Sequence, residues 1–285
     1  RTGKSTFIKK FMQELVLPQV PGAKKKRYTD ELPQSASGRT VMTTEPKFVP
    51  EEGAEIKVKD AVARVRLIDC VGFPVEGAGG FEEEGAPRLV KTPWNESPVP
   101  FQQAAEEGTR RVIRDHATIG ILMTTDGSVA EIPRIAYEPA EERAAEELKA
   151  IGKPYVIVLN CREPAGAEEL RAALEEKYGA PVLALNAETA NAAALVVALE
   201  RVLYEFPVTA VDVDLPDWMR VLDTDSPLLT EVLDGVRAVA PKICKMSDCA
   251  LLDTLYTESG RLLPPVSTEL DAATGQVRCR VEAKE

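Results

Sequence analysis

The chain has little histidine and few cysteines. Its 285 residues contain one histidine, His116, and five cysteines, none of them in a C-x-x-C pair. A histidine-rich metal site is therefore excluded, and a Ser-His-Asp triad would depend on His116 alone. The sparse, odd set of cysteines is typical of reduced thiols in a cytosolic protein. No apolar run approaches the roughly 18 residues that a helix needs to cross a bilayer, so we expect no membrane span.

Positive charge is also in short supply. The chain has 35 lysines and arginines against 46 aspartates and glutamates, a net charge of −11. This balance disfavours broad contact with nucleic acid or anionic lipid, and we expect no nucleic-acid partner. One basic run stands out, Lys24–Arg27, and we expect it to lie in a solvated loop. About 44% of the residues are apolar, which is enough to form a buried core.

The chain opens with the second half of a phosphate-binding motif. Gly3, Lys4 and Ser5 match the end of G-x-x-x-x-G-K-[ST], and an amphipathic helical run follows at once. Backbone N–H groups of such a loop bind phosphate, the lysine reaches the β- and γ-phosphates, and the serine hydroxyl binds Mg²⁺. We expect the first glycine and the preceding central strand to lie ahead of residue 1. The candidate nucleotide-binding loop comprises Arg1, Thr2, Gly3, Lys4, Ser5 and Thr6, with Thr6 beside the α-phosphate.

A second half-motif follows at a suitable distance. An apolar strand ends at Asp69, and Gly72 comes three residues later. A carboxylate at this position holds Mg²⁺ in P-loop enzymes, and the glycine N–H can meet the γ-phosphate. Between the two half-motifs, a threonine-rich loop offers Thr44, and then Thr43, as the residue that senses the γ-phosphate and contacts Mg²⁺. The two half-motifs together predict nucleotide binding.

Strand-like and helix-like segments alternate along the next part of the chain. The expected strands are 117–125, 155–159 and 181–185, and the expected helices are 101–115, 139–151, 168–178 and 190–204. This alternation predicts an α/β P-loop NTPase with a mostly parallel, doubly wound sheet flanked by helices. We place this domain at residues 1–215. Residues 216–285, with a helix at 228–240 and a strand at 277–281, form the incomplete start of a small α+β domain.

The residues after the strand at 155–159 indicate whether the site binds an adenine or a guanine nucleotide. A guanine-specific site has N-K-x-D here, whereas this chain keeps Asn160 but has Cys161 for the lysine and Glu163 for the aspartate. Without a firm carboxylate for guanine, ATP is favoured over GTP, although Glu163 could in principle replace the aspartate. After Gly72 comes Phe73, where many GTPases have a glutamine that orients water, so hydrolysis must be arranged differently.

Several stretches resemble the stage IV sporulation protein A family over about residues 1–222. They include RTGKSTFIKKFM, MTTEPKFVP, RLIDCVGF, PWNESPVPF and TTDGS. The resemblance implies a Mg²⁺-dependent ATPase that polymerises into the basement layer of the spore coat. It also implies a place in the mother-cell cytoplasm at the outer forespore membrane, with other copies of itself, coat proteins and forespore-membrane-associated proteins as partners. The family's C-terminal self-association domain is expected to lie beyond Glu285.

The resemblance also assigns roles to residues. It implies that Gly3, Lys4, Ser5 and Thr6 hold phosphate and Mg²⁺, that Thr43 or Thr44 senses the γ-phosphate, and that Asp69 is the Walker B carboxylate. Two other hypotheses stay open. The chain could be a regulatory GTPase of the translation-factor class that switches a protein partner, or a scaffold whose bound nucleotide only rigidifies the fold.

Overall fold

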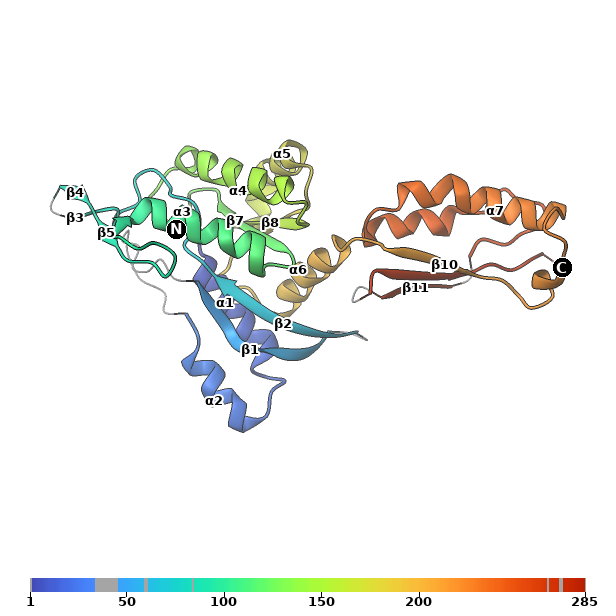
Figure 1. Ribbon diagram of the computed structural model, residues 1–285, viewed down its shortest axis with the longest axis horizontal. Helices are drawn as coiled ribbons and strands as arrows, with labels where there is room; N and C mark the ends of the chain where they lie inside the picture. The colour runs from blue at the N-terminus through green and yellow to red at the C-terminus, as the bar shows by residue number, and fades with distance from the viewer. Residues whose placement is uncertain are drawn as a thin grey trace. The chain divides into compact units, whose positions relative to one another are not determined.

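The computed structural model describes residues 2–33, 46–58, 61–83, 85–265, 267–271 and 274–284. The chain divides into two compact units, Arg1–Leu199 and Glu200–Glu285, each of which is visible in Figure 1. The division falls inside helix α6 (Ala192–Tyr204). The sequence placed the boundary after residue 215, but strand β10 (Ala210–Asp214) pairs with β12 (Gln276–Arg280) and so belongs to the second unit.

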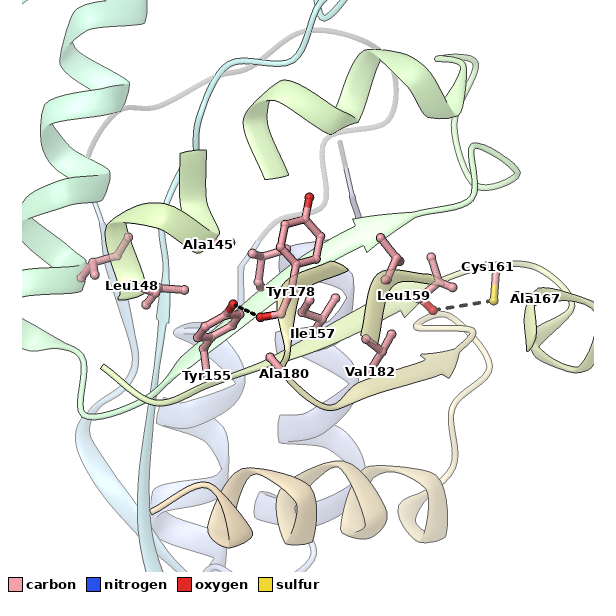
Figure 2. Close-up of a cluster of buried hydrophobic side chains, with 13 residues drawn as sticks. Ala145, Leu148, Tyr155, Ile157, Leu159, Cys161, Ala167, Tyr178, Ala180 and Val182 are labelled. Carbon is pink, nitrogen blue, oxygen red and sulfur yellow. Dashed lines mark hydrogen bonds between the residues drawn. The ribbon is translucent and has the colours of Figure 1, made fainter. Parts of the chain in front are cut away.

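A parallel sheet forms the centre of the first unit. Its strands lie in the order β7 (Gly120–Thr125), β8 (Tyr155–Asn160) and β9 (Val182–Leu185). Every residue of β8 is buried, as its continuous apolar sequence predicts for a strand covered on both faces. Figure 2 shows Tyr155, Ile157 and Leu159 in one hydrophobic cluster, because alternate residues of a strand share a face.

Helices flank this sheet, as the alternating sequence pattern predicts. On the Tyr155 side, α4 (Glu138–Ala150) contributes Ala145 and Leu148, and α5 (Glu168–Tyr178) contributes Leu174 and Tyr178 to the cluster. The first unit also contains α1 (Lys4–Phe11), α2 (Gly22–Asp30) and α3 (Phe101–Arg111), and π-helical turns extend α1 to Val16 and α3 to His116. Single 3₁₀ segments, Arg134–Tyr137 and Pro164–Ala167, precede α4 and α5. None of the helices in the described ranges is long and apolar enough to span a bilayer.

A separate antiparallel pair lies beside α1 (Figure 1). It consists of β1 (Lys47–Val58) and β2 (Ala61–Asp69), with an irregularity in the register between Val49 and Ala54. The prediction of a loop at Lys24–Arg27 is wrong, because these residues lie in α2 (Gly22–Asp30). The helix is anchored by Tyr28, which is buried and donates a hydrogen bond to Glu52 on β1, while Lys24 and Arg27 pair with the same carboxylate.

In its described residues, the glycine- and proline-rich segment after Gly72 forms two pairs of short strands. These are β3 (Glu82–Glu83) with β4 (Ala86–Pro87), and β5 (Leu89–Val90) with β6 (Val99–Pro100). Two arginine–aromatic contacts involve this segment: its Arg88 lies over Phe101, and Arg111 lies over its Trp94. These contacts attach the segment to α3, which bears Phe101 and Arg111.

The second unit is a small α+β structure. Its sheet has the order β10-β12-β11, in which β11 (Ser267–Asp271) is antiparallel to β12. Val277 and Cys279 of β12 are buried among residues of the 3₁₀ segment Met246–Thr254. The expected helix at 228–240 is present as α7 (Pro227–Val239), and the expected strand at 277–281 as β12. Shorter 3₁₀ segments occupy Met219–Val221 and Ala240–Lys242.

A buried polar cluster connects β7, α4 and α5 in the first unit. Glu141 is almost fully buried, and Arg134 forms an ion pair with it at 2.8 Å. Thr124 and Tyr178 also donate hydrogen bonds to its carboxylate. Burial, followed by the contact with Glu141, raises the pKa of Tyr178, so the phenol stays protonated and remains a donor. The charge of Glu141 is stable in the core only because these partners satisfy it.

We expect Glu141→Ala to destabilise the first unit by about 3–5 kcal/mol, because it leaves Arg134 as an uncompensated, largely buried charge. Urea unfolding followed by circular dichroism measures the effect. The matched control is Glu142→Ala, since Glu142 pairs with Lys177 at the surface. That control should cost less than about 1 kcal/mol. Equal unfolding midpoints for the two variants would contradict a stabilising role for the cluster.

Candidate nucleotide-binding site

The N-terminus of α1 is open to a ligand. Gly3 precedes the helix with a φ of 91°, a left-handed conformation that favours glycine. No side chain of the described residues caps this end, so the first N–H groups of the helix are available to an anion. Phe7, Ile8 and Phe11 fix the helix by burying its apolar face. The half-motif at the start of the chain thus forms the loop-to-helix turn that its sequence predicts.

The residues of the two half-motifs meet at this turn. The Ser5 hydroxyl donates a hydrogen bond of 2.6 Å to the Asp69 carboxylate at the end of β2. Lys4 approaches Gly72, and its ammonium would lie 3.1 Å from a Cβ added there. Gly72 also has a positive φ of 83°. The Lys4 ammonium, the Ser5 hydroxyl, the Asp69 carboxylate and the Gly72 backbone therefore lie close together.

Asn160 connects the phosphate loop to the parallel sheet. Its amide donates to the Thr2 carbonyl at 3.0 Å and accepts from the Ala187 N–H at 2.9 Å. A Cβ on Gly3 would lie 2.3 Å from the Asn160 amide nitrogen, so only glycine fits. Thr2 is buried, and its hydroxyl has no hydrogen-bond partner among the described residues. An unpaired buried hydroxyl beside an uncapped helix end is consistent with a polar ligand here.

The thiol beside Asp69 does not contribute a second negative charge. Burial raises the pKa of Cys70, and the nearby Asp69 carboxylate raises it further, although Lys4 acts in the opposite direction. Cys70 therefore stays neutral near pH 7. The carboxylate and hydroxyl oxygens of Asp69 and Ser5 are the hard ligands that Mg²⁺ prefers. The described residues include no group of three or more potential ligands of the Asp, Glu, His or Cys type.

The loops that follow the three parallel strands are tied together. Asp126, after β7, accepts hydrogen bonds from the backbone N–H and hydroxyl of Ser128. The Ser128 hydroxyl in turn accepts the Arg162 N–H at 2.9 Å, and Asn186 after β9 donates to the Arg162 carbonyl at 3.3 Å. Sequence reasoning assigned no role to these residues. The Asp-Gly pair at 126–127 is a turn signal that could have indicated the first contact.

Cys161 and Glu163 occupy different environments. The Cys161 side chain is fully buried, and burial raises its pKa to about 11. It packs in the hydrophobic cluster shown in Figure 2 and cannot lie along a base. Glu163 is exposed at the surface. Of the two residues that replace the guanine-reading pair, only Glu163 can contact a ligand.

Phe73 is held in the core rather than exposed to the site. It is buried, and the Arg143 guanidinium lies 4.9 Å from its ring centre. Arg143, on α4, also donates two hydrogen bonds to Glu106 on α3, which hold the pKa of Glu106 below its usual range. Phe73 therefore has a packing role.

The structure says less about the remaining residues that the sequence analysis considered. Thr6 lies half-buried in the first turn of α1, as the motif requires. Arg1, Thr43 and Thr44 lie outside the described residues, and the γ-phosphate sensor remains a prediction. His116, to which we assigned no chemistry, makes an edge contact with the Phe48 ring at 5.4 Å.

Comparison with known families agrees with this geometry. Residues 1–207 match the family model described as "Stage IV sporulation protein A, ATPase domain". The first unit is therefore an ATPase-family domain, with a parallel sheet flanked by helices. No solved structure shows a significant match to the chain.

Three curated relatives extend the match into the second unit. Stage IV sporulation protein A of Bacillus subtilis (strain 168) is 48% identical over 252 residues, which cover 87% of this chain and 51% of the relative. The proteins of the same name from Bacillus anthracis and Clostridioides difficile (strain 630) are 46% and 48% identical over the same length and shares. The chain belongs to the stage IV sporulation protein A family, and it spans about half the length of these relatives.

We expect Gly3→Ala to displace the Asn160 amide, because the new methyl group would collide with its nitrogen. The loss of the hydrogen bonds of Asn160 should cost roughly 1–3 kcal/mol beyond the strain of a positive φ. Gly77→Ala is the matched control, since Gly77 has a φ of 77° but open space around it. Thermal unfolding measures both variants. A melting temperature as high for Gly3→Ala as for Gly77→Ala would show that the close approach does not constrain the loop.

Proposed function

We propose that this protein is a Mg²⁺-dependent ATPase that assembles into the basement layer of the spore coat. The observation that carries the proposal is the meeting of Ser5 and Asp69, 64 residues apart, at the uncapped start of α1. A hydroxyl and a carboxylate placed side by side at a helix N-terminus suit a Mg²⁺–nucleotide complex. The names of the relatives and the family support the link to sporulation.

The residues at this site suit phosphate chemistry. The N–H groups of the first turn of α1 would bind phosphate oxygens, and Lys4 would neutralise charge at the β- and γ-phosphates. Ser5 and Asp69 would hold Mg²⁺, whose bound charge stabilises the developing negative charge during phosphoryl transfer. Gly72 would present its N–H to the γ-phosphate. We infer that the parallel sheet belongs to a doubly wound P-loop fold, in which ligands bind beyond the carboxyl ends of the strands.

ATP is the nucleotide that the base-side residues favour. Guanine needs an acceptor for its N1 and N2 donors, and leaving such donors unpaired costs roughly 1–3 kcal/mol each. Of the two residues that replace the guanine-reading pair, Cys161 is buried and Glu163 is exposed. The alternative, a regulatory GTPase of the translation-factor class, requires Glu163 to read guanine. Competition between ATP and GTP for the site separates these two hypotheses.

The assembly part of the proposal concerns the full-length protein. We propose that it polymerises with copies of itself at the outer forespore surface, on the mother-cell side, and contacts other coat and forespore-membrane-associated proteins. Thr43 or Thr44 would sense the γ-phosphate and couple its presence to assembly. A ligand shifts a conformational equilibrium only through differential affinity for the two states, and a γ-phosphate sensor provides that difference.

In the full-length protein, Lys4→Ala should weaken ATP binding, whereas Asp69→Asn should spare much of the binding and reduce Mg²⁺-dependent hydrolysis. A loss of roughly a hundredfold or more in hydrolysis is expected for either variant, because Lys4→Ala removes a positive charge that would stabilise the transition state and Asp69→Asn would weaken the hold on Mg²⁺. Phosphate release measures the rate. Lys9→Ala is the control, since Lys9 lies exposed on the same helix. Wild-type hydrolysis by Lys4→Ala would rule out the P-loop assignment, and binding without phosphate release by the wild type would favour the scaffold hypothesis.

Assembly should depend on the γ-phosphate. We expect the full-length protein to sediment as polymer with ATP, and to stay largely in the supernatant with ADP or without nucleotide. Replacing Thr43 and Thr44 by alanine should reduce the ATP-dependent pellet more than it reduces ATP binding. Equal pellets in all three nucleotide conditions would contradict nucleotide control of assembly.

A further inference from the structure

Arg162 lies at the carboxyl edge of the parallel sheet, close to the phosphate loop. Asn160, two residues earlier, bonds directly to the Thr2 carbonyl. Because consecutive Cα atoms are about 3.8 Å apart, the Cα atoms of Arg162 and Asn160 are within about 8 Å of each other. The side chain of Arg162 therefore starts beside the candidate nucleotide site, at the edge where ligands of parallel α/β sheets bind.

The backbone of Arg162 is fixed from two sides. Its N–H donates to the Ser128 hydroxyl, and its carbonyl accepts from the Asn186 amide. Ser128 is itself held by two hydrogen bonds to the Asp126 carboxylate. Side chains from the loops after β7 and β9 thus position a residue in the loop after β8. Such support fixes the backbone from which the Arg162 side chain extends, so less backbone order has to be gained when a ligand binds.

The guanidinium of Arg162 has no partner among the described residues, although the chain is rich in carboxylates. Arg162 is exposed, and no described acceptor forms a hydrogen bond or an ion pair with its side chain. Other arginines of the first unit behave differently: Arg110, Arg134, Arg143 and Arg171 each pair with a glutamate. The backbone of Arg162 is therefore held in place, while its guanidinium is unpaired among the described residues.

We propose that the planar guanidinium of Arg162 packs on the base of the bound nucleotide, and this inference rests on the proposed function. A guanidinium is flat and weakly hydrated, and it stacks on aromatic faces. A phosphate contact is less suitable, because the carboxylates of Asp126, Glu163 and Glu188 lie in the same three loops and repel a polyanion. Cys161 cannot serve, since its side chain is buried. Arg162 is thus a base-binding residue.

The test compares a ligand that has a base with one that lacks it. ATP and inorganic tripolyphosphate are titrated calorimetrically, each with Mg²⁺, into the full-length wild type, Arg162→Ala and Arg162→Lys. We expect Arg162→Ala to bind ATP roughly tenfold more weakly and tripolyphosphate as the wild type does. Arg162→Lys should resemble Arg162→Ala, because an ammonium retains the charge but lacks the plane. Arg114→Ala, another exposed arginine of the first unit, serves as the control and should bind both ligands normally.

Two results would overturn the inference while leaving the proposed function intact. Unchanged ATP affinity in Arg162→Ala would show that the side chain does not contact the nucleotide. Equal losses for ATP and tripolyphosphate, restored by Arg162→Lys, would show a phosphate contact instead. A wild-type protein that binds neither ligand would overturn the proposed function and the base contact together.

Discussion

The buried amide of Asn160 connects the turn before α1 to the parallel sheet. It bonds to Thr2 on one side and to Ala187 on the other, so the start of α1 and the segment after β9 have a fixed separation. Both polar ends of the amide are satisfied, which allows it to be buried without a large penalty. Because the amide occupies the space beside Gly3, residue 3 cannot carry a side chain. The position of Ser5 opposite Asp69 depends on this placement of the loop.

Much of the first unit follows from strong local patterns. The continuous apolar runs of β7 and β8 and the amphipathic start of α1 are visible in the sequence because burial requires them. Helix α2 and strand β1 were not predicted, because their sequences lack such a clear pattern of burial. The charged side chains of α2 hide its single buried anchor, Tyr28, and the partner of that anchor, Glu52, lies 24 residues away. Contacts of this kind depend on the tertiary fold and leave no periodic signal.

In the candidate site, too, some residues follow from local sequence motifs and others depend on the tertiary fold. Gly3, Lys4, Ser5, Asp69 and Gly72 could be predicted, since the chemistry of phosphate binding fixes their residue types and spacing. The support around Arg162 could not, because it links three loops whose proximity depends on the order and register of β7, β8 and β9. The domain boundary could not be predicted from local patterns either. Strand β10 belongs to the second unit because it pairs with β12, more than sixty residues later.

Arg143 links the contact between α3 and α4 to the loop after Gly72. Phe73 follows Gly72 directly and lies under the Arg143 guanidinium, which also holds Glu106. Arg143, on α4, contacts both the Phe73 ring and the Glu106 carboxylate on α3. Displacing Phe73 would remove the first of these two contacts. The contact between α3 and α4 is thereby connected, through Phe73 and Arg143, to the backbone that follows Gly72.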